Sequence, residues 1–239
     1  MLQRNFDTLT GHTIVCGYGR NGKQTVKELI SHDQIVLVVE NDSKEIEELE
    51  QFPEVYYLVG DATRDEVLNM AFVASARALI TTLPKDADNL FVVITARIFN
   101  SNIPIVSRAS ELQSQKKIYS AGASEIIMPD KLGGQRMAEL VMEPDVVEFL
   151  DYILLQDKEQ TNLEEISVTH INKSFIKKTI REFNVQNVSG SNIIGLKTVK
   201  GEYVLNPNAD YSLENASHIF VLGNPQQINR LKELIISGA

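Results

Sequence analysis

The 239-residue sequence has a single cysteine, no tryptophan and fewer basic than acidic residues. The lone cysteine, Cys16, cannot form a disulfide within the chain, which is typical of a protein from a reducing compartment. The 23 Lys and Arg residues against 32 Asp and Glu give a formal net charge of −9. This balance argues against nucleic acid as the main partner, because binding a phosphate backbone requires clustered cations.

Long hydrophobic runs are also missing. Runs such as Ile35–Val39 and Ala78–Ile80 are far shorter than the ~20 residues of a membrane-spanning helix. The segment Met1–Gly11 lacks the apolar stretch of a secretory signal. Because hydrophobic residues make up 43% and charged residues 23%, we expect a soluble, cytosolic globular protein.

The first 130 residues alternate short aliphatic runs with stretches of helical periodicity. Continuous apolar runs are typical of strands buried on both faces of a parallel sheet. Their alternation with helices predicts right-handed crossovers and a doubly wound α/β domain. The predicted strands are Thr13–Cys16, Ile35–Glu40, Tyr56–Val59, Ala78–Thr82, Ile105–Ser107 and Glu125–Met128. The predicted helices are Lys23–Ser31, Ser43–Gln51, Arg64–Met70, Asp86–Phe99 and Ser110–Ser120.

Beyond residue 130 the pattern changes. Leu132–Met142 predicts a helix that ends before Pro144, because proline cannot extend a helix. An apolar stretch, Val146–Leu155, then leads to a β-rich half with a closing amphipathic helix at Gln226–Ile236. We expect an α/β domain over 1–130, a crossover helix and linker over 131–157, and a smaller α+β domain over 158–239. The predicted strands of the last are Ile166–Ile171, Ile193–Val199, Tyr203–Leu205 and His218–Leu222.

The most informative motif is a glycine-rich turn between the first strand and the first helix. It matches the G-x-G-x-x-G fingerprint of Rossmann-like dinucleotide-binding domains. There the first glycine allows a tight turn, the second lets the backbone approach a pyrophosphate, and the third lets the helix pack on the sheet. Free N–H groups and the helix dipole favour a phosphate at this point. The candidate residues are Gly17, Tyr18, Gly19, Arg20, Asn21 and Gly22, with Arg20 either a phosphate ligand or a solvated side chain.

An acidic residue, Glu40, ends the second strand 18 residues after Gly22. Acids at this place in the fold bind ribose hydroxyls and disfavour the 2′-phosphate of NADP. Its neighbour Asn41 is a second candidate ligand at the same edge, or a helix cap. The alternative is a fold of this type that has lost its ligand, with Glu40 at a solvated strand end.

Three further segments follow predicted strands. Open α/β sheets bind ligands outside the carboxyl ends of their strands. Asp61 and Ala62 follow the third strand, Thr81 and Thr82 the fourth, and Arg108 the fifth. The alternative interpretations are that Asp61 caps the next helix, that the threonines simply end a strand, and that Arg108 belongs to an interface.

Catalytic groups are not recognisable in the sequence. A dehydrogenase needs a proton donor or acceptor at the hydride site, but the four histidines are scattered and no tyrosine precedes a lysine by four residues. Cys16 is expected to be a buried small residue and not a nucleophile. A nucleotide site without catalytic groups favours a sensor. Two acidic groups could bind Ca²⁺, although such groups on an acidic chain usually form solvated surface: Glu143, Asp145 and Glu148, and Asp157 and Glu159.

Several motifs together resemble RCK domains, the regulators of potassium conductance. The run His12–Gly22 resembles their start, and Gly60–Thr63 is similar to their third-strand motif. Ala121–Ala123 with Ile126–Pro129 is similar to the end of the nucleotide-binding lobe. Residues from about 158 onward look like the companion C-terminal lobe, with Tyr203–Pro207, Tyr211–Leu213 and Ile219–Gly223, so the resemblance covers nearly the whole chain.

The resemblance implies a ligand-sensing module, not an enzyme, on the cytoplasmic side of the cell membrane. It implies binding of NAD(H) or an adenine nucleotide (ADP or ATP), and Ca²⁺ in some members. Gly17, Gly19, Arg20 and Gly22 would hold the phosphates, Glu40 the ribose, and Asp61 with Ala62 the adenosine end. It also implies a homodimer paired through the Leu132–Met142 helix, an octameric gating ring, and a potassium channel pore domain as partner.

Two potassium systems fit this resemblance. We expect the gating part of a channel subunit, because Leu2–Gly11 resembles the linker that follows an inner pore helix. A free-standing regulatory subunit of a potassium uptake system is the alternative. The competing classes are an NAD-dependent oxidoreductase with unrecognised catalytic groups and an interaction scaffold with an empty nucleotide site.

Overall fold

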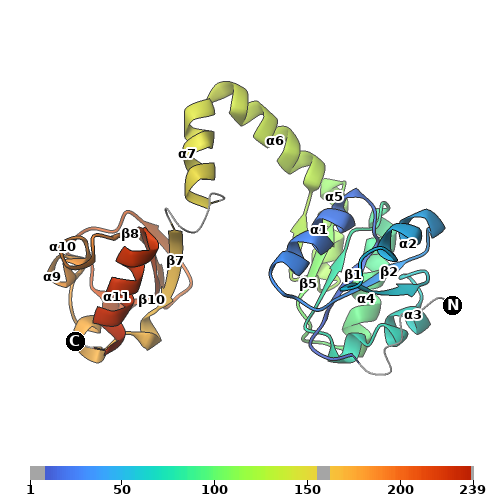
Figure 1. The fold of residues 1–239 in the computed structure, drawn as a ribbon, viewed down its shortest axis with the longest axis horizontal. Helices are drawn as coiled ribbons and strands as arrows, with labels where there is room; N and C mark the ends of the chain where they lie inside the picture. Colours follow the sequence, from blue (N-terminus) through green and yellow to red (C-terminus); the bar gives the residue numbers. More distant parts are fainter. Residues whose placement is uncertain (1–8, 155–161, 238–239) are drawn as a thin grey trace. The chain divides into compact units, whose positions relative to one another are not determined.

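The computed structural model describes residues 9–154 and 162–237 (Figure 1). Contacts divide the chain into two compact units, Met1–Met137 and Ala138–Ala239, each with its own sheet and core. Within the described ranges, no helix has both the length and the apolar character needed to cross a membrane.

The first unit is built on a six-stranded parallel sheet with the order β3-β2-β1-β4-β5-β6. The order reverses between β1 and β4, as in Rossmann-like domains, so the predicted doubly wound fold is confirmed. The strands are β1 (Thr13–Cys16), β2 (Val36–Glu40), β3 (Tyr56–Val59), β4 (Ala78–Thr81), β5 (Ile105–Arg108) and β6 (Glu125–Ile127). The helices are α1 (Arg20–Ser31), α2 (Ser43–Leu49), α3 (Asp65–Met70), α4 (Asp86–Phe99) and α5 (Leu112–Ser120), with a 3₁₀ turn at Val73–Ser75.

Alternate residues of the strands pack into two separate cores, because successive side chains of a strand point to opposite faces. On one face, Val15 of β1 packs in a cluster with Val26 of α1 and with residues of α2. On the other face, Ile14 joins a cluster with Val92 of α4 and Ile118 of α5. These two layers hold the carboxyl ends of the strands at one edge of the sheet.

A helical pair follows β6. Helix α6 (Pro129–Met142) ends where proline was expected to stop it, and α7 (Pro144–Leu154) begins at that proline. The predicted linker is therefore helical through Leu154, and Leu155 lies outside the described residues. Helix α6 buries none of its residues within the chain. Its exposed apolar side chains are Leu132, Met137, Leu140, Val141 and Met142.

The second unit holds a four-stranded antiparallel sheet with the order β7-β10-β8-β9. Its closing helix, α11 (Pro225–Ser237), places Ile228 and Leu231 in the core of this unit, beside Ile219 of β10. The predicted small α+β domain is thus confirmed. Its strands are β7 (Asn162–Ser167), β8 (Asn192–Thr198), β9 (Tyr203–Leu205) and β10 (Ala216–Gly223).

Two parts of this unit differ from the sequence-based prediction. The expected strand Ile166–Ile171 is displaced: β7 begins at Asn162 and stops at Ser167, because the Ser167 hydroxyl accepts the N–H of Thr169 and starts a 3₁₀ turn. Three short helices in this unit were not predicted, since segments of four or five residues are too short to show helical periodicity. They are α8 (Lys173–Ile176), α9 (Ile180–Phe183) and α10 (Val185–Ser189).

Candidate nucleotide-binding site

A cavity of about 770 Å³ opens at the carboxyl ends of the first four strands. Sites for small molecules typically measure roughly 300–1,000 Å³. Ten of the thirteen predicted site residues line it: Gly17, Gly19, Arg20, Asn21, Glu40, Asn41, Asp61, Ala62, Thr82 and Arg108. Tyr18, Gly22 and Thr81 lie outside the lining. Residues that the sequence analysis missed are Val39, Asp42, Glu45, Gly60, Thr63, Leu83, Pro84, Lys85 and Asp88.

The three glycines of the turn have three different surroundings. Gly17 has a φ of +94°, a conformation that side chains disfavour. At Gly19 an added Cβ would meet no atom within 4 Å, so this position is open. At Gly22 an added Cβ would lie 2.0 Å from the carbonyl oxygen of Gly17. Gly22 therefore serves the packing of α1 against the turn, which is why it does not line the cavity.

Helix α1 begins inside the glycine turn, at Arg20, and not at Lys23 as predicted. The N–H of Lys23 donates to the oxygen of Gly19 at 2.9 Å, which closes the first helical turn. The N–H groups before it belong to the unpaired first turn of the helix, where an anion is favoured. The Arg20 guanidinium is exposed and lines the cavity, and it has no ion pair with any residue that the structure describes.

Glu40 connects the end of β2 to the glycine turn. Its Oε2 accepts the backbone N–H of Tyr18 at 2.5 Å. Its Oε1 accepts the N–H groups of Asn41 at 2.7 Å and Asp42 at 2.8 Å. A carboxylate has about four acceptor positions, so capacity remains for a ligand hydroxyl.

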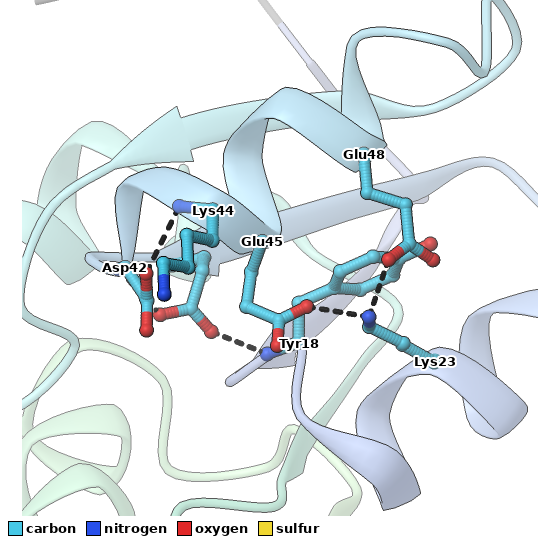
Figure 2. A network of polar contacts seen from close by, with 7 residues as sticks. Tyr18, Lys23, Asp42, Lys44, Glu45 and Glu48 are labelled. Atoms are coloured by element: carbon cyan, nitrogen blue, oxygen red, sulfur yellow. Dashed lines mark hydrogen bonds and ion pairs between the residues drawn. The ribbon is translucent and has the colours of Figure 1, made fainter.

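An ion-pair network joins α1 to α2 (Figure 2). The Lys23 ammonium lies 2.6 Å from Glu45 and also pairs with Glu48. Hydrogen bonds from these two carboxylates raise the pKa of Lys23. Tyr18 is buried next to them, and burial raises the pKa of its phenol. The Tyr18 side chain therefore anchors the turn in the core cluster with Val15 and Val26, while its backbone N–H binds Glu40.

The two threonines after β4 have different roles. Thr81 is buried, and its hydroxyl donates to Oδ1 of Asn89 at 2.6 Å, so it is a structural residue of the strand end. Thr82 lines the cavity, and its hydroxyl donates to the oxygen of Gly17 at 3.1 Å. Thr82 thus ties the end of β4 to the glycine turn.

Asp61 does not cap the following helix, contrary to one of its two predicted roles. Its Oδ1 accepts both the N–H and the hydroxyl of Thr63, at 2.9 and 2.8 Å. These bonds lower the pKa of Asp61. Helix α3 starts only at Asp65, and its N-cap residue Arg64 makes no side-chain cap. The carboxylate instead shapes the loop after β3.

Asp86 ties the loop after β4 to the loop after β5. Its carboxylate accepts the N–H of Ser110 at 2.8 Å and that of Glu111 at 3.0 Å. Burial alone would raise the pKa of Asp86, but these hydrogen bonds outweigh it and lower the pKa. The tie holds the neighbouring Lys85 and Asp88 in the cavity wall.

Positively and negatively charged side chains line different parts of the cavity. Cations come from the glycine turn, the loop after β4 and the end of β5, whereas most of the carboxylates follow β2 and β3. In the strand order, β2 and β3 lie on one side of β1 and β4 and β5 on the other, while the glycine turn follows β1 itself. The cations are Arg20, Lys85 and Arg108, and the carboxylates are Glu40, Asp42, Glu45, Asp61 and, in α4, Asp88.

Metal and thiol chemistry find little support among the described residues. No group of three or more His, Cys, Asp or Glu side chains in the described ranges could hold a metal ion. Asp157 and Glu159, one of the two acidic groups considered for Ca²⁺, lie outside those ranges. Cys16 is buried as predicted, and burial with the charge of Glu40 raises the pKa of its thiol to about 12.

Comparison with known protein families shows which family the chain belongs to. Residues 13–129 match the TrkA-N domain and residues 163–236 match the TrkA-C domain. The chain belongs to the RCK family of paired TrkA-N and TrkA-C domains. The TrkA-N match covers all six strands of the parallel sheet, and the TrkA-C match covers the antiparallel sheet from the second residue of β7 onward.

This RCK chain is similar to two channel proteins of Methanocaldococcus jannaschii. Probable potassium channel protein 2 is 32% identical over 240 residues, with 98% of this chain and 69% of the relative covered. Potassium channel protein 1 is 31% identical over 229 residues, with coverages of 95% and 67%. The RCK chain therefore spans about two thirds of the length of these relatives.

Among solved structures, this RCK chain is similar to the GsuK channel bound to NAD. The match covers 97% of this chain and 40% of the GsuK chain. The TM-score is 0.50 and the identity 22%, which shows a shared fold.

Proposed function

We propose that this RCK chain is the ligand-sensing gating part of a potassium channel, on the cytoplasmic side of the membrane, and that its cavity binds NAD(H) or an adenine nucleotide. The observation that carries the proposal is the division of charge around the cavity. Cations beside a glycine turn suit phosphates, whereas carboxylates at the ends of β2 and β3 suit ribose hydroxyls. A nucleotide likewise carries charged phosphates in one part and ribose hydroxyls in another.

The position of each group suggests how the nucleotide lies. Its phosphates rest on the first turn of α1, with Gly19 giving the close approach and Arg20 a charge partner. The ribose reaches Glu40, whose three backbone hydrogen bonds hold the carboxylate in place. The adenosine end extends toward Asp61 and Ala62 after β3.

The potassium channel assignment rests on the relatives. Both M. jannaschii proteins are named as potassium channel proteins. The GsuK channel of similar fold is described as bound to NAD, which is the ligand class that the cavity suits. None of the described residues that line the cavity is His, Cys or Tyr. Because both relatives are named as channels, we infer that the site acts as a sensor, in which binding shifts a conformational equilibrium.

Exposed apolar surfaces favour assembly of several copies. Helix α6 exposes 67% of Met137 and 83% of Val141, and we propose that it pairs with the same helix of a second copy. A second apolar surface lies on α4 and α5, which pack side by side. Two such surfaces on one chain allow dimers to join into a closed ring, which we propose to be octameric. The exposed residues of the second surface are Phe91, Ile94, Ile98, Leu112 and Tyr119.

Calorimetric titration of the chain with NAD, NADH, ADP and ATP tests the ligand assignment. We expect saturable binding of at least one of them, and binding of NADP at least about tenfold weaker than that of NAD, because a 2′-phosphate would meet the carboxylates after β2. Absence of binding by all four would leave an interaction scaffold. Sustained oxidation of NADH with small carbonyl compounds would overturn the sensor proposal in favour of an enzyme.

Channel gating is tested with a chimera. The RCK part of Probable potassium channel protein 2 is replaced by this chain, and potassium flux is measured in vesicles with and without the nucleotide that binds. A change in flux on nucleotide addition is expected. Equal flux in both conditions, with a correctly assembled chimera, would contradict the gating role.

A further inference from the structure

Arg108 lies where two cavities meet. It ends β5 and lines the candidate nucleotide cavity. It also lines a second cavity, of about 510 Å³, between α1, β4, β5 and the chain that leads from β6 into α6. The residues of that connecting segment in the second cavity are Ile127, Pro129 and Leu132.

The positive charge of Arg108 is poorly compensated. Its side chain is only 19% exposed. Nη2 donates to Oγ of Ser110 at 3.2 Å and lies 3.8 Å from Oδ2 of Asp130, in the first turn of α6. Nε is buried and has no hydrogen-bond partner in the part of the chain that the structure describes. A guanidinium carries five N–H donors, and the Nε donor is the one whose burial without a partner is costly.

Asp130 is a weak partner for this cation. Its side chain is 85% exposed, and 3.8 Å is too long for a hydrogen bond. Arg108 lines the nucleotide cavity, where a phosphate could accept two N–H donors of the guanidinium, which is the stronger geometry for arginine. Because Nη2 makes the contact with Asp130, a movement of the guanidinium toward a phosphate would weaken its pairing with Asp130.

We propose that Arg108 exchanges Asp130 for nucleotide phosphate, and that this exchange couples occupancy of the cavity to the first turn of α6. The inference rests on the proposed nucleotide site and adds a route by which that site acts. Helix α6 continues from the first unit into the second, so a change at its first turn can pass along the helix. The coupling is reciprocal, so whatever holds Asp130 against Arg108 also opposes nucleotide binding.

A double-mutant cycle tests the exchange, with calorimetric affinities for ADP and NAD. Arg108→Ala alone should weaken binding about tenfold, because a phosphate partner is lost. Asp130→Asn alone should tighten binding about three- to fivefold, because it removes the competing anion. In the Arg108→Ala background, Asp130→Asn should leave the nucleotide affinity unchanged. Equal tightening in both backgrounds would mean that Asp130 only repels phosphate, and would overturn the exchange.

Two further variants separate this result from simple charge or folding effects. Glu125→Gln removes one negative charge from an exposed position of β6 outside both cavities, and should leave both affinities unchanged. Arg108→Lys keeps the charge without the guanidinium, and should melt at the temperature of the unchanged chain while binding ADP about threefold more weakly. An affinity equal to that of the unchanged chain would contradict bidentate binding of phosphate by Arg108.

Hydrogen exchange gives a readout at α6 itself. Amides in the first two turns of α6 should exchange faster when ADP is added to the unchanged chain, and Arg108→Ala should abolish this change. If ADP or NAD binds but α6 does not respond, the exchange proposal fails while the nucleotide site stands. If neither ligand binds, both proposals fail.

Discussion

The carboxylate of Glu40 accepts the backbone N–H of Tyr18, at 2.5 Å, across 22 residues of sequence. This bond fixes the end of β2 against the glycine turn, so the proposed ribose ligand and the proposed phosphate-binding turn form one rigid unit. Pre-organisation of this kind lowers the entropy cost of binding.

Replacement of Glu40 by alanine should therefore affect both binding and stability. We expect at least about tenfold weaker nucleotide binding and a loss of about 1–2 kcal/mol in the free energy of unfolding, because a partly buried N–H loses its acceptor. Calorimetry and urea denaturation measure the two effects. Glu125→Ala, at an exposed position outside the cavity, is the control and should change neither. Unchanged nucleotide affinity in Glu40→Ala would refute the ribose assignment.

Alanine substitutions at two glycines of the turn should have different effects, one on stability and the other on nucleotide binding. Gly22→Ala places a methyl group 2.0 Å from a carbonyl oxygen, and should lower the free energy of unfolding by about 3 kcal/mol. Gly19→Ala meets no protein atom, so it should leave the melting temperature unchanged while blocking the approach of phosphate and weakening binding about tenfold. Thermal denaturation and calorimetry on both variants check this.

Gly133 provides the control for these substitutions. It lies in α6 and has open space around its Cβ position, so Gly133→Ala should stabilise the chain by about 0.5–1 kcal/mol through helix propensity. The prediction would be wrong if Gly19→Ala and Gly22→Ala lowered the melting temperature equally.

His12 should give the stability of the protein a dependence on pH between about 5 and 7. Its Nε2 lies 2.9 Å from the oxygen of Ala71, whereas Nδ1 is buried without a partner among the described residues. Burial lowers the pKa of His12 below its ordinary value near 6.5. As pH falls below that value, the unfolded chain binds a proton that the folded chain excludes, so the free energy of unfolding decreases.

His12→Gln should flatten this dependence, since an amide can still donate to Ala71 but does not titrate. Denaturation curves at several pH values above 5 avoid the range in which Asp61 and Asp86, whose pKa values are lowered, lose their stabilising contribution. His32→Gln, at an exposed histidine, is the control. An equally steep slope in His12→Gln would assign the effect to other groups.

The apolar surface of α6 should control association. Met137→Lys places a charge in the proposed contact between copies and should shift the protein toward monomer by at least about tenfold in the dissociation constant. Analytical ultracentrifugation over a range of concentrations measures this shift. Gln135→Lys introduces the same charge at an exposed polar position of the same helix and should leave association unchanged. Identical behaviour of the two variants would place the dimer contact elsewhere.

The doubly wound fold was predictable because its strands are continuous apolar runs and its helices are long enough to show a period. Strand Tyr56–Val59 and helix Asp86–Phe99 have the same bounds in the structure as in the prediction. The second unit was less predictable. Residues 173–189 fold into single-turn helices, two of which start at the capping side chains of Asn172 and Thr179, and such local bonds leave no periodic pattern.

The cavity was predictable where its residues directly follow strands, because parallel strands end at a common edge. Lys85 and Asp88 were missed, since Asp86 holds the start of α4 through backbone N–H groups of Ser110 and Glu111, a contact that sequence spacing does not reveal. Thr81 belongs to the same strand end as Thr82, but it points into the protein and bonds to Asn89. Strand alternation can separate the two threonines only when the register is known.

The burial of Cys16 makes the native chain suitable for selective labelling. It is the only cysteine of the sequence, it lies inside β1, and its thiol has a pKa raised to about 12 by burial and by the charge of Glu40. Maleimides react with accessible thiolates, so this thiol is inert to them near neutral pH. A cysteine introduced at the exposed Lys131 of α6 would carry a fluorophore at one defined point, and its emission would follow nucleotide binding in real time with the native cysteine left in place.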